Sequence, residues 1–280
     1  MIIYFNDDYI KEEDCFISPY DRGFLFADGI YEVIKYTGKK FFEFDSHLSR
    51  LNNGLEYLKI NYTESMKLLE ICKNLILRNN LENSLASVYI QITRGISKPR
   101  NHLFPEIQTP PTILVNVSEL KSENEKTGFK VILTEDIRWS GCNIKTISLL
   151  PNVLARQKAY ENNADEALLV RNGFITEGSH TNIFAVRDGN LYTAPLSNHI
   201  LPGITRKVVL NICRKIGIPI FEISIKADEI YSYDELFLTS TKMDIVPVLQ
   251  VGERLINNGK PGPVTVKLSK ALVGLIKNYF

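Results

Sequence analysis

Residues 121–128 form a stretch without one apolar side chain near the middle of the chain. Such a stretch adds nothing to a hydrophobic core, so it predicts a linker between separately packed parts. It divides the 280 residues into segments of about 120 and about 150 residues, both of ordinary domain size. We therefore predict an N-terminal domain over 1–120, a linker over 121–128 and a C-terminal domain over 129–280.

The composition argues against several classes of protein. Apolar residues make up 44% of the chain and charged residues 23%, which is ordinary for a globular protein. The 33 basic and 32 acidic residues leave a net charge of +1, so the charge balance favours neither nucleic acid nor an anionic membrane as a partner. No apolar run approaches the ~20 residues of a membrane-spanning helix. The first residues resemble a strand rather than a signal peptide.

The cysteines and histidines show neither a disulfide pattern nor a metal-binding motif. Four cysteines without metal-ligand spacing are typical of reduced thiols in a cytoplasmic protein. The four histidines are scattered and contain no His-x-x-x-His pair. We therefore expect a cytoplasmic protein without a bound metal. These residues are Cys15, Cys72, Cys142, Cys213, His47, His102, His180 and His199.

The N-terminal segment mixes predicted strands and helices. Leucines at helical spacing predict a helix over 45–58, capped by Asp45-Ser46, and a similar pattern predicts one over 63–79, capped near Thr63. Runs with strand composition predict strands over 2–9, 31–36, 87–93 and 112–117.

Two turn signals dominate the C-terminal segment. Asn172-Gly173 and Asp188-Gly189 each lie between β-rich runs, and both positions of such a turn need positive φ, so each predicts a hairpin. Gly217 is expected to end the second helix of this segment. The other expected elements are strands over 129–134 and 235–239 and helices over 152–162 and 205–215. The whole pattern predicts an α+β fold with two subdomains.

Lys145 is a candidate nucleophile. Most lysines are surface residues, but Lys145 stands among Ile144, Ile147, Leu149 and Leu150. Partial desolvation by such neighbours lowers the pKa of an ammonium group and leaves a nucleophilic amine. On the residues alone, both a surface lysine and a Schiff-base lysine remain open.

Glu177 is a candidate acid for holding a ring nitrogen. It follows a predicted strand and precedes Gly178-Ser179, where glycine permits close approach of backbone and ligand. A carboxylate beside a pyridine nitrogen favours the protonated ring by charge pairing. An exposed carboxylate at a strand end is the alternative.

Several residues could bind an anion such as phosphate. Pro202-Gly203 leads into the helix that begins near Ile204 and Thr205, and the first turn of a helix has free N–H groups and a positive dipole end. Ser240 and Thr241 offer hydroxyl groups, and Arg50 offers a charged contact. The alternatives are an ordinary capped helix, plain turn residues and a solvated arginine.

A long polar loop over 95–111 carries Arg100 and His102. These two donors, two residues apart, can meet one carboxylate if the loop is extended. Loops of this length without internal structure are often functional. The hydroxyl of Tyr31 could join them, although a core-edge aromatic is an equally good interpretation. An amine, an acid and a helix-start anion site are together the groups that a pyridoxal phosphate enzyme requires.

Taken together, these residues resemble the class IV pyridoxal phosphate aminotransferases. The similarity extends from Asp21-Arg22-Gly23-Phe24 through Asp28-Gly29-Ile30-Tyr31-Glu32-Val33 to Thr239-Ser240-Thr241. Within the class, Arg100-x-His102 is similar to the signature of the D-amino-acid branch. The resemblance implies a smaller N-terminal α/β domain and a larger C-terminal domain with a β-barrel-like sheet and helices.

The resemblance also implies roles for individual residues. Lys145 would bind pyridoxal 5′-phosphate as a Schiff base and carry the proton. Glu177 would pair with the pyridine nitrogen, and Leu201 would pack on the ring. Phosphate ligands would be Arg50, Ile204, Thr205, Ser240 and Thr241. The α-carboxylate trap would be Tyr31, Arg100 and His102, with the Arg100/His102 loop reaching the active site of the partner subunit in a homodimer.

The implied reaction is transfer of an amino group between a D-amino acid, such as D-alanine, and a 2-oxo acid, 2-oxoglutarate or pyruvate. It would follow a ping-pong course through pyridoxamine phosphate and give D-glutamate or D-alanine. Alternatives with the same fold are an L-branched-chain aminotransferase, an (R)-amine transaminase and an aminodeoxychorismate lyase, and a silent binding protein is a further one. One departure is His180, which stands where the family often has a small hydroxyl residue and which could alter the substrate range.

Overall fold

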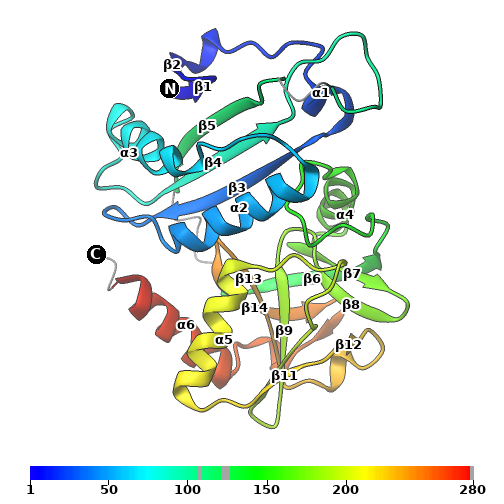
Figure 1. Cartoon of the computed structure of the whole chain (residues 1–280). Coiled ribbons are helices and arrows are strands. Elements are labelled where there is room, and N and C mark those ends of the chain that lie inside the picture. The colour runs from blue at the N-terminus through cyan, green and yellow to red at the C-terminus, as the bar shows by residue number, and fades with distance from the viewer. Residues whose placement is uncertain (106–108, 121–126, 278–280) are drawn as a thin grey trace. The chain divides into compact units, whose positions relative to one another are not determined.

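The computed structural model describes residues 1–105, 109–120 and 127–277. Among these residues the chain forms two compact units, which Figure 1 shows. Unit 1 comprises 1–120 with 144–148, and unit 2 comprises 127–143 with 149–277. Most of the predicted linker lies outside the described residues, so the domain boundaries stay a prediction. The Lys145 segment groups with unit 1.

Unit 1 contains a five-stranded antiparallel sheet in the order β2-β1-β5-β4-β3. Its first hairpin turns at Asn6 and Asp7, both with positive φ (45° and 74°). The prediction of one strand over 2–9 was therefore wrong, because these two polar residues break it into two. The strands are β1 (Ile2–Phe5), β2 (Asp8–Lys11), β3 (Gly29–Tyr36), β4 (Ala86–Thr93) and β5 (Thr112–Glu119).

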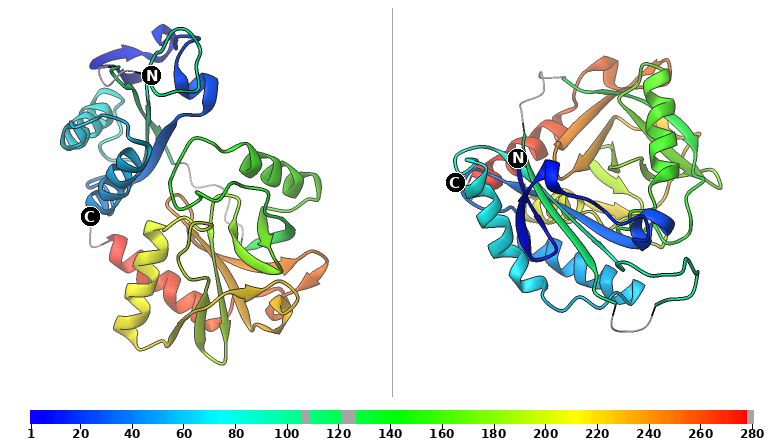
Figure 2. Two further views of the ribbon diagram at one scale, coloured as in Figure 1. Left: turned by 45° about the vertical axis from the view of Figure 1, so that its right-hand side comes forward. Right: turned by 90° about the horizontal axis from the view of Figure 1, so that it is seen from above.

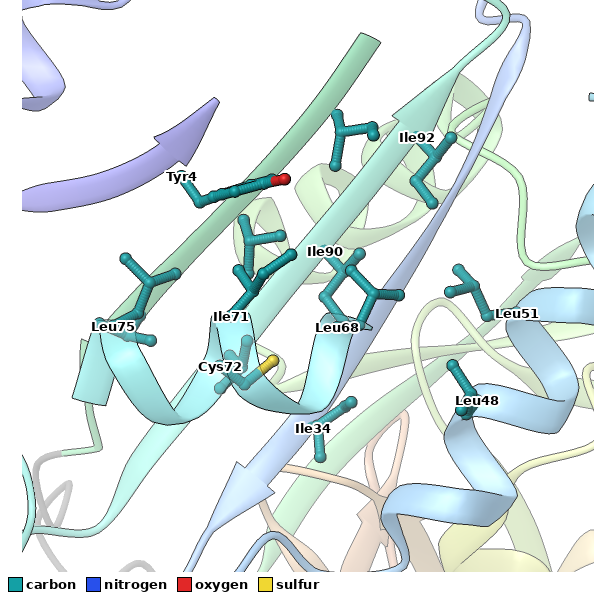
Figure 3. Packing of buried hydrophobic residues seen from close by; sticks show 14 of the residues in the cluster. Tyr4, Ile34, Leu48, Leu51, Leu68, Ile71, Cys72, Leu75, Ile90 and Ile92 are labelled. Carbon is teal, nitrogen blue, oxygen red and sulfur yellow. The ribbon is translucent and has the colours of Figure 1, made fainter. Parts of the chain in front are cut away.

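Helices α2 (Phe44–Leu58) and α3 (Leu68–Arg78) bury their apolar stripes on this sheet. Figure 3 shows Leu48 and Leu51 of α2 and Leu68, Ile71 and Leu75 of α3 among the isoleucines of β3 and β4. Burial of such a stripe, rather than helix propensity alone, stabilises helices of this length.

The predicted caps of these helices were wrong. Neither helix has a side-chain cap: α2 is preceded by Glu43 in the left-handed region, and α3 by Lys67 at the end of a short 3₁₀ turn, Ser65–Lys67. The Ser46 hydroxyl donates instead to Glu43 (2.7 Å). A shorter helix α1 (Arg22–Phe26) is capped by Asp21, whose side chain accepts from Gly23 N. A further 3₁₀ turn covers Glu12–Asp14.

Unit 2 is built on a curled, mixed ten-stranded sheet, which Figure 2 shows from two sides. Its order is β11-β10-β9-β13-β14-β6-β7-β8-β12, with β15 paired to β14. Both predicted hairpins are confirmed: Asn172-Gly173 joins β7 to β8 and Asp188-Gly189 joins β9 to β10, all four residues with positive φ. The strands are β6 (Phe129–Glu135), β7 (Glu166–Arg171), β8 (Phe174–Gly178), β9 (Asn182–Arg187), β10 (Asn190–Thr193), β11 (Ile220–Glu222), β12 (Ile225–Lys226), β13 (Glu235–Ser240), β14 (Asp244–Val251) and β15 (Arg254–Leu255).

Three helices pack on this sheet: α4 (Leu150–Glu161), α5 (Ile204–Ile216) and α6 (Pro263–Lys277). The small side chains of Ala155 and Ala159 let α4 approach β7 closely. Figure 1 shows α5 (yellow) beside α6 (red). Gly217 ends α5 with φ 75°, as predicted. Two 3₁₀ turns, Ile230–Ser232 and Asn257–Gly259, complete the unit.

The predicted α+β class is confirmed, with a small antiparallel sheet in one unit and a larger curled sheet in the other. No helix in the described part of the chain is long and apolar enough to cross a membrane.

Candidate active site

Glu177 lies at the end of β8 and is almost fully buried. Its Oε1 accepts a hydrogen bond from Arg138 Nη1 (2.5 Å), its Oε2 accepts one from Asn182 Nδ2 (2.9 Å), and Leu201 N donates to both oxygens (3.3 and 3.1 Å). A carboxylate has about four lone-pair directions, and these contacts come from three donors. Glu177 is thus fixed in orientation and keeps capacity for one more donor.

Burial is the main influence on the protonation of Glu177. It raises the pKa of the carboxyl group from 4.5 to about 7, although the charge and hydrogen bond of Arg138 act in the opposite direction. Arg138 is itself held by Asp136 through Nε (2.9 Å) and Nη2 (3.0 Å). The pKa of Asp136 is lowered to about 2 because the Arg138 contacts outweigh its burial. The pKa of the Glu177 carboxyl group therefore lies near neutral pH.

Asn182, the first residue of β9, joins Glu177 to the start of α5. Besides Glu177, its Nδ2 donates to Leu201 O (3.1 Å). A Cβ atom at Gly203 would collide with Asn182 Oδ1, so this position requires glycine. Glu177, Leu201 and the beginning of α5 therefore lie together in unit 2.

The N-terminus of α5 is a suitable anion site. Its N-cap is Gly203, and no side-chain cap hydrogen bond is formed there by the described residues. Ile204 and Thr205 in that turn are buried. Uncapped N–H groups with the positive end of the helix dipole favour a phosphate.

The end of β13 adds hydroxyl groups near the same place. Thr239 pairs in register with Asn182, so Ser240 and Thr241 follow directly after this neighbour. Thr239 Oγ1 is buried and has no hydrogen-bond partner among the described residues. Buried polar atoms in folded proteins are normally paired, so this hydroxyl has capacity for a polar group of a ligand. Ser240 Oγ accepts from Met243 N (3.3 Å) and shapes the turn that carries Thr241.

Lys145 lies beside Tyr31 in unit 1. Tyr31 N donates to Lys145 O (3.0 Å), and Ile147 N donates to Gly29 O (3.1 Å), so the 144–148 segment is attached along β3. Lys145 Nζ lies 4.1 Å from the centroid of the Tyr31 ring, and the lysine is partly buried. The backbone of Lys145 is thus held along β3, and its amine has the Tyr31 ring as a neighbour; its role as the Schiff-base lysine stays a prediction.

Arg50 lies close to the same end of β3. Its Nε and Nη2 donate to the two oxygens of Glu32 (2.7 and 2.9 Å), and His47 Nδ1 contacts Glu32 Oε2 (2.8 Å). Burial alone would raise the pKa of Glu32, but Arg50 and His47 hold it below its ordinary value. Burial lowers the pKa of His47, and Glu32 opposes that effect. Arg50 is therefore an oriented, largely buried cation rather than a solvated one; its contact with phosphate stays a prediction.

Arg100 and His102 are exposed on the loop after β4. Both pack around Phe26 of α1: the Arg100 guanidinium carbon lies 4.6 Å from the Phe26 ring centroid, and the His102 ring lies 5.2 Å from it. Among the described contacts, none joins either side chain to Tyr31 or Lys145. The chain brings these two predicted donors together with each other, but not with Tyr31.

His180 forms a contact that the sequence did not predict. Its Nδ1 lies 2.9 Å from Oε2 of the buried Glu166, while about half of its side chain is exposed. Glu166 also accepts from Ser179 Oγ (2.5 Å) and Thr181 Oγ1 (3.1 Å). This network fixes the turn between Glu177 and Asn182.

Sequence reasoning missed four residues of these networks: Arg138, Asp136, Glu32 and His47. Each is a charged or titratable residue that also has a partner 15 or more positions away along the chain; Arg138, for example, is 39 positions from Glu177. A weak signal was present in Glu32, a lone acid within a strongly apolar strand. Within the described residues no cluster of His, Cys, Asp or Glu is arranged to hold a metal ion.

Unit 2 contains a buried acid beside an uncapped helix start, and unit 1 contains a partly buried lysine. A pyridoxal phosphate enzyme requires groups of these kinds, and the comparisons agree with this class. The model of the amino-transferase class IV family matches residues 29–251. The chain therefore belongs to the class IV aminotransferases, which are pyridoxal phosphate-dependent transferases.

Similar proteins cover almost the whole chain. A D-alanine aminotransferase from Staphylococcus epidermidis (strain ATCC 35984) is 37% identical, covering 99% of this chain and 98% of its own. One from Listeria monocytogenes (strain 10403S) is 35% identical, with 98% and 95% covered. Among solved structures, the branched-chain amino acid aminotransferase from Escherichia coli superposes with a TM-score of 0.89 at 24% identity, over 98% of this chain and 94% of that one. A second branched-chain amino acid aminotransferase, solved with pyridoxamine 5′-phosphate, also has a TM-score of 0.89, at 23% identity, with 100% and 95% covered.

The residues present fit this cofactor. The uncapped first turn of α5 suits its phosphate, the remaining acceptor capacity of Glu177 suits a ring N–H, and the unpaired Thr239 hydroxyl suits a further polar atom. The individual residue roles stay predictions.

Proposed function

We propose that this chain transfers the amino group between a D-amino acid, D-alanine or a similar one, and a 2-oxo acid such as 2-oxoglutarate or pyruvate. The observation that carries the proposal is the near full-length similarity to proteins named D-alanine aminotransferase. The paired donors Arg100 and His102 support it, since both rest on Phe26 as one unit. D-Glutamate or D-alanine would be the product, with ping-pong kinetics.

Each residue of the site has a role in this proposal. When bound, pyridoxal phosphate supplies an electron sink for the substrate α-carbon. Lys145 Nζ would hold the cofactor and would move a proton to and from the substrate α-carbon. Glu177 would pair with the ring nitrogen, and Arg138 and Asn182 keep its carboxyl group oriented. Leu201 would pack on the ring.

In this proposal the start of α5 and the neighbouring hydroxyl groups bind the phosphate. Ile204 and Thr205 offer uncapped N–H groups, and Ser240 and Thr241 offer hydroxyls. Arg50 adds a positive charge whose orientation Glu32 already fixes. A preoriented charge loses little side-chain entropy on binding.

Substrate binding in this proposal involves a homodimer. Tyr31, Arg100 and His102 bind the α-carboxylate, and the Arg100/His102 loop serves the active site of the partner subunit. That arrangement fixes which face of the α-carbon meets Lys145, and so it selects D-substrates. Large exposed apolar residues support an interface: Phe24 of α1 is 74% exposed, and Leu150 and Val153 of α4 are 69% and 59% exposed.

The proposal places the enzyme in the cytoplasm. All four cysteines are free, and two of them, Cys72 and Cys213, are completely buried. Reduced thiols are typical of that compartment.

A panel of amino donors tests the reaction. The purified enzyme, loaded with pyridoxal phosphate, is mixed with D-alanine, L-alanine, L-leucine or an (R)-amine, and the change in cofactor absorbance is followed. We expect D-alanine to react and L-leucine not to. The L-branched-chain alternative rests on the solved structures, which at 23–24% identity show the fold alone. Reaction with L-leucine but not D-alanine would establish that alternative and refute the proposal.

Mixed dimers test the role of the loop in trans. Lys145→Ala chains, which should be inactive, and Arg100→Ala chains, which should have little activity at D-alanine concentrations far below their raised KM, are refolded together. If Arg100 serves the partner's site, a mixed dimer contains one site with both Lys145 and Arg100, and D-alanine activity is regained. If both residues act in the same chain, no site is intact and mixing regains nothing.

A further inference from the structure

One buried guanidinium holds the backbone of the Arg100/His102 loop. Arg22, the first residue of α1, donates from Nη1 to Asn101 O (2.7 Å) and Leu103 O (3.2 Å), and from Nη2 to His102 O (3.5 Å). Arg22 is only 3% exposed. Three successive carbonyl groups, directly after Arg100, are thus fixed by a single side chain.

Asp28 orients Arg22. Its Oδ2 accepts from Arg22 Nε (2.8 Å), and the same carboxylate accepts from Arg94 Nε (2.7 Å) and Nη2 (2.9 Å). Arg94 is buried too and also donates to Leu58 O (2.7 Å) and Lys59 O (3.0 Å) at the end of α2. Charge-assisted bonds of this kind are short and directional. The loop backbone is therefore tied through Arg22 and Asp28 to the rigid part of unit 1.

The loop side chains rest on the other end of the same short helix. Phe26 lies under both Arg100 (4.6 Å) and His102 (5.2 Å between rings). Figure 1 shows α1 and the loop after β4 at the same end of the sheet. Helix α1 therefore fixes the backbone of the loop through Arg22 and its side chains through Phe26.

Such fixing matters because Arg100 and His102 are exposed. Ordering an exposed arginine on binding costs side-chain entropy, and ordering its loop costs more. A loop that is already held in place avoids most of that cost. We propose that Arg22, oriented by Asp28, is a positioning residue that preorganises Arg100 and His102 for the substrate α-carboxylate. This inference rests on the proposed function.

The test combines steady-state kinetics with hydrogen exchange on the holoenzyme. Arg22→Met keeps an apolar stem and removes the three carbonyl contacts; Arg22→Lys keeps the charge, and Asp28→Asn removes the orienting charge. Ile71→Val, on α3 in the core of unit 1, serves as a control for general loss of stability. Each substitution is also made in an Arg100→Ala/His102→Ala background.

We expect Arg22→Met to raise the KM for D-alanine roughly tenfold, as when one charged hydrogen bond is misaligned. The saturating rate and the cofactor absorbance should stay near those of the unsubstituted enzyme, and amide exchange at 100–104 should accelerate. Arg22→Lys should recover part of the effect, and Asp28→Asn should show a weaker version of it. In the Arg100→Ala/His102→Ala background, Arg22→Met should change the KM by less than about twofold, since the groups it positions are gone.

Three outcomes would overturn the inference while leaving the proposed function intact. The first is an unchanged KM in Arg22→Met, and the second is an equal rise in KM in both backgrounds. The third is a rise equal to that of Ile71→Val, because the effect would then be general destabilisation. Failure of the unsubstituted enzyme to react with D-alanine would instead refute the proposed function.

Discussion

Glu177 should make the stability of the cofactor-free protein depend on pH, and Glu177→Gln removes that dependence. Burial raises the pKa of Glu177 to about 7 in the folded protein, from 4.5 in an ordinary setting. The folded state therefore holds this proton more tightly than the unfolded chain does. The stabilising contribution is complete below pH 4.5 and is lost as the pH rises toward 7.

The size of the effect follows from the two pKa values. The difference between 4.5 and about 7 is about 2.5 units, and one unit corresponds to about 1.36 kcal/mol, so about 3 kcal/mol is lost over that range. Glutamine does not titrate. Between about pH 4.5 and about pH 8, the unsubstituted protein should therefore lose about 3 kcal/mol of unfolding free energy relative to Glu177→Gln.

Urea unfolding of both cofactor-free proteins, at one protein concentration and at several pH values, measures this shift. Comparing the two proteins at each pH cancels the titration of groups that both share. Their difference should rise between about pH 4.5 and about pH 7 and then level off. A difference that stays constant within about 0.5 kcal/mol would refute the argument, because Glu177 would then have the same proton affinity in the folded and unfolded states.

Glu166→Gln in the same unit should show the opposite pH dependence of stability, because His180 and Ser179 outweigh burial and lower the pKa of Glu166. The variant should be most destabilised at neutral pH and least destabilised in acid. A loss of unfolding free energy that grows in acid would contradict this. Arg100→Ala should weaken D-alanine binding by ~1.5–3 kcal/mol, as for a charged hydrogen bond; an unchanged KM would remove Arg100 from the carboxylate trap. Gly203→Ala places a methyl group against Asn182 Oδ1 and should weaken cofactor binding by ~1–3 kcal/mol, measured by cofactor titration. The control Gly217→Ala, distant from Asn182, should leave cofactor binding unchanged. Equal effects of the two substitutions would contradict the argument that Gly203 permits close approach to Asn182.

Local signals explain which parts of the fold the sequence predicted. Asn172-Gly173 and Asp188-Gly189 specify their turns through positive φ alone, so both hairpins were predictable. The same kind of signal in Asn6-Asp7 was overlooked, and one strand was predicted instead of two. The strands β11, β12 and β15, of two or three residues each, are too short to show a pattern. Helix α6 was missed although Leu268, Leu272 and Ile276 repeat at helical spacing.

Closeness in sequence also explains which residues of the candidate site could be predicted and which could not. Glu177 and the start of α5 could be predicted because their neighbours, glycines and small polar residues, are adjacent in sequence. Arg138 could not, because its importance lies in reaching a buried carboxylate 39 positions away. In the sequence, Arg22 is only one residue of the Asp21-Arg22-Gly23-Phe24 motif. The structure shows that it donates hydrogen bonds to carbonyl groups about 80 positions away.

The most direct test of the central claim is exchange of the α-hydrogen of alanine in heavy water, without a 2-oxo acid, followed by proton NMR. The claim is that Lys145 moves a proton on the face that a D-amino acid presents. The enzyme should exchange the α-hydrogen of D-alanine, leave that of L-alanine in place, and lose this exchange in Lys145→Ala. Exchange of L-alanine in preference to D-alanine, or undiminished exchange in Lys145→Ala, would contradict the account.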